Sequence, residues 1–116
     1  MITRDFDISV DLKFLSTSDG GRKTPVFSSY RGKHDFGLEE VLLDAVHEYV
    51  GTNQIMPGQS AYAYFTFLSP ELLNGKLTEG FKFKVQEGNK IVATGKVSKI
   101  FNNALRCNAK QSIKNE

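Results

Sequence analysis

The stretch Gly20-Gly-Arg-Lys-Thr-Pro-Val-Phe-Ser-Ser-Tyr-Arg31 contains the signals that decide the fold of this chain. Its glycine pair closes a polar segment that begins at Ser16, and this predicts a turn because glycine adopts positive φ without steric cost. Thr24-Pro25 marks the start of a strand, where the missing N–H of proline does least harm. Val26 to Tyr30 then reads as a short strand. The stretch therefore predicts a turn that leads directly into a β-sheet.

Alternating apolar and polar residues predict further strands on both sides of this stretch. Phe6 to Phe14 alternates strictly, which is typical of a strand with one buried and one wet face. The turn Met56-Pro57-Gly58-Gln59 leads into residues 61–68, where Ala61, Ala63, Phe65 and Phe67 share one face. Nine Phe and four Tyr, with no Trp, also favour pleated, half-buried surfaces.

The clearest hairpin lies near the C-terminal end. Residues 81–86 alternate, residues 91–101 return as a second strand, and Gly88-Asn89 supplies a two-residue turn between them. Gly95 lies inside the returning strand, and this predicts either a bulge or a close approach of two backbones.

Residues 38–50 show a different period. Gly37 and Gly51 bracket this segment, and its apolar residues fall at helical spacing, namely Leu38, Val41, Leu42, Ala45, Val46, Tyr49 and Val50. Taken alone, the segment predicts an amphipathic helix of about three turns. A strand would form here only if tertiary context overrode the pattern.

Together these elements predict an all-β fold: a small, closed, antiparallel, six-stranded β-barrel of Greek-key type, with one short helix near residues 38–50. At 116 residues and 13.0 kDa the chain has room for one domain. We place the barrel in residues 1–101 and a polar C-terminal tail in residues 102–116, because the latter have no sustained apolar period.

Composition limits the cellular location and the chemistry. The sequence shows neither a secretory signal nor a stretch of ~20 apolar residues, so we expect a cytoplasmic protein with no membrane contact. The single Cys107 cannot form an internal disulfide or a thiolate metal cage. We therefore expect no metal and no cofactor.

Charge is uneven along the chain. Residues 1–59 carry six Lys and Arg against nine Asp and Glu, whereas residues 60–116 carry nine against four. This asymmetry predicts a basic face, formed by Arg22, Arg31, Lys33, Lys82, Lys84, Lys90, Lys96 and Lys99. Such a face would suit an anionic partner, while Tyr62 and Tyr64 could stack on bases. The alternative is a set of lysines that only solvate the outer strand faces.

Four motifs in order resemble the C-terminal β-barrel domain, domain III, of the translation elongation factor Tu family. The stretch 20–31 is similar to that family's GGRHTPFFxxYR, and Met56-Pro57-Gly58 is similar to its MPGD turn. Residues 79–83 are similar to its GLRF segment, and residues 87–95 lie where the family has EGGRTVGAG. The resemblance covers most of residues 4–101 and implies a non-catalytic barrel module.

The same resemblance implies a set of binding residues. In the family this barrel contacts the T-stem backbone of aminoacyl-tRNA and docks against the nucleotide-binding domain. It assigns the RNA role to Arg22 and Gly88, with Lys33 where the family has glutamine and Lys90 where it has arginine. We extend this basic surface to Lys23 and Arg31. Surfaces that domain docking would cover in the family imply an exposed apolar patch at Val26, Phe27 and Tyr30.

No catalytic constellation is evident in the sequence. A phosphate loop of the GxxxxGK[S/T] type is missing, so we expect neither nucleotide binding nor GTP hydrolysis. The acidic residues, including Asp7 and Glu87, are expected on wet strand faces or turns rather than in a shared cleft. His34 and His47 are more consistent with solvent-facing or packing histidines than with metal ligands.

The sequence thus predicts a protein that is not an enzyme. The leading hypothesis is a module that binds another protein, within the translation machinery or by mimicry of it. The alternative is a module that binds tRNA-like structured RNA through its basic face. An enzyme with an unrecognised site is the third class, and it would require a cleft of convergent polar groups.

Overall fold

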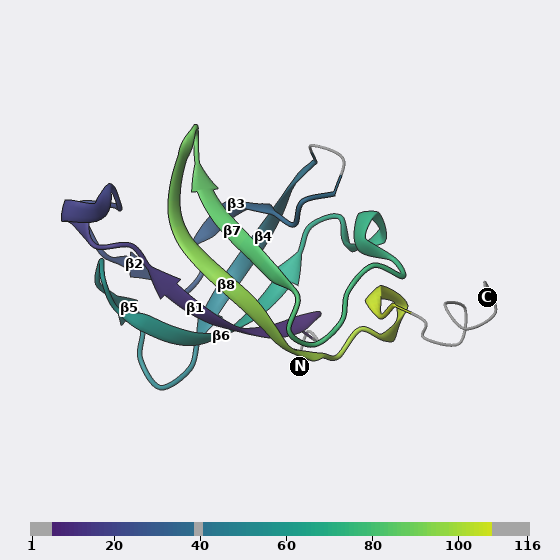
Figure 1. Ribbon diagram of the computed structural model, residues 1–116. Coiled ribbons are helices and arrows are strands. Elements are labelled where there is room, and N and C mark those ends of the chain that lie inside the picture. Colours follow the sequence, from purple (N-terminus) through teal and green to yellow (C-terminus); the bar gives the residue numbers. More distant parts are fainter. Residues whose placement is uncertain (1–5, 39–40, 108–116) are drawn as a thin grey trace.

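The computed structural model describes residues 6–38 and 41–107, and its strands curl into a closed barrel (Figure 1). The barrel consists of β1 (Ile8–Phe14), β3 (Arg31–Asp35), β4 (Leu42–Tyr49), β6 (Ser60–Phe67), β7 (Lys82–Glu87) and β8 (Lys90–Ile100). Neighbouring strands follow the order β1-β6-β4-β3-β7-β8, all antiparallel, and β8 closes the barrel on β1. The prediction of a closed six-stranded antiparallel barrel is therefore confirmed.

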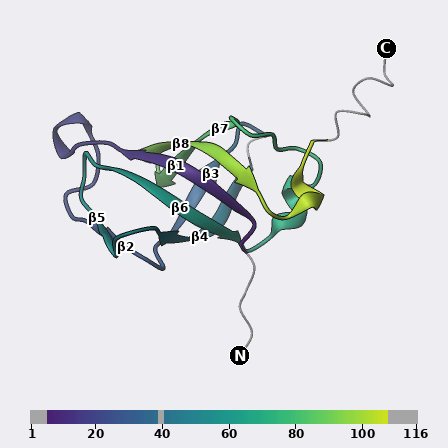
Figure 2. The same cartoon turned by 90° about the horizontal axis from the view of Figure 1, so that it is seen from below.

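Short elements cover the two ends of the barrel. At one end, β2 (Val26–Phe27) and β5 (Gln54–Ile55) form a separate two-stranded sheet, and the 3-10 turn η1 (Thr17–Asp19) precedes it. At the other end, the 3-10 turns η2 (Pro70–Leu73) and η3 (Asn103–Leu105) lie together (Figures 1 and 2). None of the helical segments in residues 6–38 and 41–107 is long and apolar enough to cross a membrane.

The helix predicted near residues 38–50 is wrong, because β4 occupies most of this segment. The inward residues of β4 are Leu43, Ala45, His47 and Tyr49, which alternate with more exposed neighbours. β4 pairs with β3 on one side and β6 on the other, so its backbone hydrogen bonds are satisfied between strands. A polar histidine at an inward position concealed the two-residue period. Val41, Leu42 and Val50, which completed the helical pattern, are exposed.

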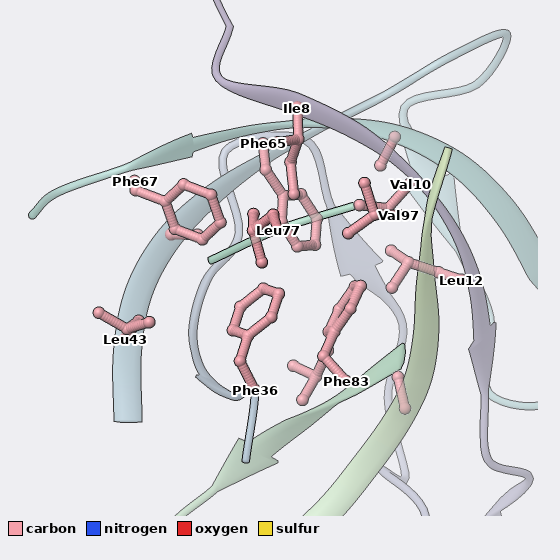
Figure 3. Close-up of a cluster of buried hydrophobic side chains, with 14 of the residues drawn as sticks. Ile8, Val10, Leu12, Phe36, Leu43, Phe65, Phe67, Leu77, Phe83 and Val97 are labelled. Atoms are coloured by element: carbon pink, nitrogen blue, oxygen red, sulfur yellow. The ribbon is translucent and has the colours of Figure 1, made fainter. Parts of the chain in front are cut away.

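The core fills the barrel interior from the inward faces of its strands. Ile8, Val10 and Leu12 of β1 and Phe65 and Phe67 of β6 point into the interior, where the rings of Phe36 and Phe83 stack at 4.9 Å between centroids (Figure 3). Leu73, Leu77 and Leu105 are fully buried at the end covered by η2 and η3. Burial of these side chains and of the rest of the core removes apolar area from water and stabilises the barrel.

The packed structure continues past the predicted boundary at residue 101. The backbone N–H of Cys107 donates to the carbonyl of Leu77 at 2.6 Å, and Leu105 is fully buried. The side-chain amide of Asn102 donates to Asp7 Oδ1 at 2.9 Å. Residues 102–107 therefore form part of the fold, while the remainder of the predicted tail, 108–116, lies outside the described residues.

The β7–β8 hairpin turns at Gly88-Asn89 as predicted, with Glu87 paired to Lys90 and Gly88 at φ 60°. Gly95 has a different role from the two that we expected. The irregularities in register lie opposite Val85/Gln86 and Ser9/Val10, not at Gly95. A Cβ at residue 95 would lie 2.3 Å from Cζ of the Phe83 ring, so the glycine makes room for a side chain rather than for a backbone.

The contact between Gly95 and Phe83 generates a stability prediction. We expect Gly95→Ala to lower the free energy of unfolding by about 1–3 kcal/mol, because the added methyl group overpacks the core against the ring. Chemical denaturation of the purified protein measures this. In a Phe83→Leu background the alanine should cost less than about 1 kcal/mol, since the ring is gone. An equal cost in both backgrounds would show that the ring is not the obstacle.

Candidate functional site

The residues predicted to contact RNA or a partner lie at three places in the structure. Arg22 lies beside the β7–β8 hairpin, Arg31 and Lys33 lie on β3, and Gly88 and Lys90 lie at the hairpin turn. Lys23 is exposed in the connection before β2. The first two groups are engaged within the protein, which limits what they can offer a partner.

Arg22 is held by a network of contacts with its own fold. Its guanidinium forms an ion pair with Glu87 and donates to Thr24 Oγ1 at 3.0 Å, and it lies 5.6 Å from the centroid of the Tyr30 ring. The Tyr30 hydroxyl donates to the same Glu87 carboxylate at 2.5 Å. Burial raises the pKa of the Tyr30 hydroxyl, and its hydrogen bond to Glu87 raises that pKa further. These three side chains tie the segment before β2 to the end of β7.

Arg31 and Lys33 share one carboxylate on the neighbouring strand. Lys33 Nζ lies 2.7 Å from Asp44 Oδ1, and an Arg31 guanidinium nitrogen lies 3.2 Å from Oδ2. The hydrogen bond from Lys33 holds the pKa of the Asp44 carboxyl below its usual value, and Arg31 adds to the effect. Both cations remain more than half exposed, at 59% and 54% of the side chain. They are therefore accessible, and the Asp44 carboxylate balances one of their two positive charges.

The predicted apolar patch is not formed as a patch. Val26 is buried, with 2% of its surface exposed, and it belongs to the core. Tyr30 is half-buried and packs against that core. Only Phe27, which is 48% exposed, presents a large apolar surface to solvent. Val26 is thus unable to contact a partner directly, because its side chain serves the interior.

Both histidines lie inside the barrel as a hydrogen-bonded pair. His34 Nε2 lies 2.8 Å from His47 Nε2, His34 Nδ1 lies 2.9 Å from the Leu43 carbonyl, and His47 Nδ1 lies 2.9 Å from the Tyr49 hydroxyl. A carbonyl can only accept, so His34 carries its proton on Nδ1. His34 Nε2 then accepts from His47 Nε2–H, and His47 Nδ1 accepts from the Tyr49 hydroxyl. Two neutral imidazoles complete this chain with no unpaired donor on either ring.

Burial keeps both rings neutral. It lowers the pKa of His34 from 6.5 to about 4, and it lowers the pKa of His47 well below its usual value, with His34 adding to the effect. The pair packs between Phe65, Phe83 and Tyr30. The packing interpretation of the histidines is therefore confirmed. Among residues 6–38 and 41–107, no group of three His, Cys, Asp or Glu side chains is arranged to hold a metal ion.

Asp7 also differs from its predicted wet position. Its carboxylate is buried and accepts from the backbone N–H of Phe67 at 2.8 Å and from the Asn102 amide at 2.9 Å. Asp7 and Glu87 therefore act as structural acceptors at the two ends of the barrel.

A concavity crosses the outer face of five adjacent strands. It has a volume of about 960 Å³ and is lined by three consecutive residues from each of β1, β6, β7 and β8 and from the end of β3, namely residues 11–13, 60–62, 82–84, 94–96 and 35–37. On β1 and β7 the flanking residues are exposed, whereas the central Leu12 and Phe83 point into the core. We call this concavity the lysine groove, because Lys13, Lys82, Lys84 and Lys96 line it.

The sequence predicted three of these lysines, Lys82, Lys84 and Lys96, as members of the basic face, but it did not distinguish them from the other members of that face. Lys13 Nζ donates to the Gly58 carbonyl at 2.7 Å. Lys82, Lys84 and Lys96 are exposed and take part in none of the ion pairs formed within residues 6–38 and 41–107. The signal that distinguishes them is strand register, which sequence alone did not supply. No protein-family model matches the chain.

The buried histidine pair predicts acid-sensitive stability. Unfolded histidines titrate near pH 6.5, so below that pH the unfolded state binds protons that the folded core excludes. The stabilisation is complete above about pH 6.5 and declines as pH falls toward about 4, with His34 alone accounting for about 3 kcal/mol of the free energy of unfolding. Urea unfolding at a series of pH values measures this decline.

A His34→Phe/His47→Phe double variant is the control for that experiment. Phenylalanine retains a planar ring but does not titrate, so the decline between pH 6.5 and about 4 should become much smaller. If the double variant keeps the wild-type pH dependence, the histidines are not its source.

The Arg22 network predicts a structural effect before any effect on binding. We expect Arg22→Ala to lower the free energy of unfolding by about 1–2 kcal/mol, because it leaves a half-buried Glu87 carboxylate without its ion pair. Thermal unfolding at neutral pH tests this. Arg31→Ala is the matched control, since Asp44 keeps Lys33 and an exposed pair contributes less than about 1 kcal/mol. Equal losses from both variants would contradict the assignment.

Proposed function

We propose that this chain is a non-enzymatic binding module that acts by contact with another protein. The observation that carries the proposal is the lysine groove, a concavity of about 960 Å³ that spans five strands. Within the groove, exposed lysines lie on either side of residues that point inward. The groove therefore combines charged groups with the apolar stems of the lysine side chains. Protein interfaces commonly combine an apolar centre with a polar rim.

The state of the titratable groups supports a role without catalysis. Both histidines are fully buried and hydrogen-bonded to one another. The carboxylates of Asp7, Asp44 and Glu87 each accept hydrogen bonds within the fold. A general acid or base must reach the proton that it transfers, and these groups are already committed to structural partners.

The link to translation rests on the four motifs that resemble domain III of the elongation factor Tu family. A closed six-stranded antiparallel barrel is the fold that this resemblance implies, and the fold supports the proposal to that extent. We therefore place the module in the cytoplasm, within the translation machinery or in mimicry of one of its surfaces.

Structured RNA is the alternative partner. Gly88 and Lys90 are exposed at the hairpin turn, where a phosphate backbone could approach them. However, Arg22 is held by Glu87, and Arg31 and Lys33 share Asp44. Arg22 and Lys33, two of the residues that the resemblance assigns to RNA, are thus already paired with carboxylates of the fold, and this favours protein as the partner.

Affinity capture from cell extract, with and without RNase, separates the two partners. We expect the immobilised wild-type protein to retain a reproducible protein partner after RNase treatment, because direct protein contact does not depend on RNA. An Arg22→Lys/Lys90→Gln variant serves as the control for RNA contact. Loss of all bound protein after RNase, or capture of RNA alone, would overturn the proposal.

A further inference from the structure

The side chains over the lysine groove form two rows that follow from strand register. In the first row Asp11 pairs with Lys96, and Lys96 pairs with Lys82. In the second row Lys13 pairs with Thr94, Thr94 pairs with Lys84, and Lys84 pairs with Asp35. Directly paired residues on neighbouring strands point to the same face, so each row crosses the barrel surface perpendicular to its strands.

The first row contains a like-charge pair that does not stabilise the sheet. Lys82 and Lys96 are direct partners across β7 and β8, and like charges in such positions destabilise a sheet. Lys84 follows two residues after Lys82 on the same face. No acidic side chain pairs with Lys82 or Lys96 in an ion pair among the described residues, although Asp11 is the register partner of Lys96. An anionic group bound between these lysines would relieve their repulsion.

The charges at the edges of the groove indicate what kind of anion fits. Asp11 and Asp35 also line it, so the lysines are accompanied by two carboxylates. A nucleic acid carries a negative charge at every phosphate and would meet these carboxylates as well as the lysines. A polypeptide can place acidic residues over the lysines and neutral or basic residues over Asp11 and Asp35.

The aromatic content of the groove points the same way. Phe36 and Phe83 line it, but their rings are buried in the core. Tyr62 is the one remaining aromatic residue of the lining, and its hydroxyl donates to Ser9 Oγ at 2.6 Å while its ring contacts Tyr64 edge-on. Sequence-tolerant binding of single-stranded nucleic acid uses several rings on which successive bases stack. The groove does not provide such a series.

We infer that the lysine groove binds an extended, acidic polypeptide segment of the partner, lying across the strands, an inference that rests on the proposed protein-binding function. Five strands separated by about 4.8 Å give a groove about 19 Å long, which accommodates about six extended residues. Acidic side chains of this segment lie against Lys82, Lys96 and Lys84, and its backbone crosses above Gly95. The barrel is closed, so side chains rather than an added strand recognise the segment.

The test uses a synthetic peptide of about eight residues that alternates threonine and glutamate, a length that spans the groove. Titration into the ¹⁵N-labelled full chain should shift the amide resonances of the groove residues on β1, β7 and β8. The affinity should weaken as salt rises toward physiological strength, since exposed charges are screened. A peptide that alternates threonine and lysine should not bind.

Two charge-matched variants locate the contact. Lys82→Gln/Lys96→Gln should weaken binding of the acidic peptide about tenfold. The control Lys76→Gln/Lys99→Gln removes the same charge from exposed residues outside the groove and should leave affinity within about twofold. The groove variant should melt at the wild-type temperature or above it, because its like-charge pair is gone. Equal binding by both variants would overturn the inference.

Two further outcomes separate this inference from the proposed function. A short oligouridylate or an RNA hairpin that binds the groove more tightly than the acidic peptide would overturn the acidic-segment assignment. If the partner captured from extract binds the Lys82→Gln/Lys96→Gln variant as well as wild type, the protein-binding function stands and the groove assignment fails.

Discussion

Closure of the sheet on β1 is the constraint on which the rest of this structure depends. Every residue of β1 has a register partner in β8, and all but Phe14 also have one in β6. Strand β1 therefore closes the barrel by pairing with β6 on one side and with β8 on the other. Asp7 fixes this junction. Its carboxylate accepts from β6 at Phe67, and its carbonyl accepts from the backbone N–H groups of Phe101 and Asn102. Closure removes exposed edges on the barrel and creates an interior in which every polar group must find a partner.

The histidine pair shows how the interior meets that requirement. His34 and His47 lie on adjacent strands, and each imidazole can both donate and accept while neutral. The chain from the Leu43 carbonyl through both rings to the Tyr49 hydroxyl uses these capacities in one direction only. Replacement of one ring by an apolar residue would leave the other ring without its hydrogen-bond partner, so the two positions are coupled physically.

Sequence reasoning succeeded where one signal dominated a segment. Alternation identified β1 and β7, a shared apolar face identified β6, and the turn Gly88-Asn89 identified the hairpin that returns as β8. It failed at β4, because inward His47 interrupts the apolar alternation while exposed Val41, Leu42 and Val50 complete a helical spacing. Only pairing on both sides, a property of the closed sheet, overrides that local pattern.

The candidate site was harder to predict, since charge counts do not give partners. Arg22 looked free in the sequence, yet Glu87, sixty-five residues away, neutralises it. Leu105 looked like part of a polar tail, yet the fold buries it beside Leu77. In both cases the decisive contact joins residues distant in the chain, and no local period encodes such a contact.

Closure of the barrel brings the strands of the lysine groove side by side. Because β1, β6 and the β7–β8 hairpin are distant from one another in the chain, no local pattern in the sequence indicates the groove. In the central row of the groove Leu12 pairs with Gly95, and Gly95 pairs with Phe83. The Phe83 ring fills the space inward of Gly95. Lys82 and Lys96 lie beside these residues, and the fold thereby places two like charges in the lining of the lysine groove. A sheet selected only for stability would place opposite charges there, as β3 and β4 do with Lys33 and Asp44. The contrast between these two strand pairs, in one barrel, is the physical reason why the proposed binding surface is centred on β7 and β8 rather than on the ion-paired face of β3 and β4.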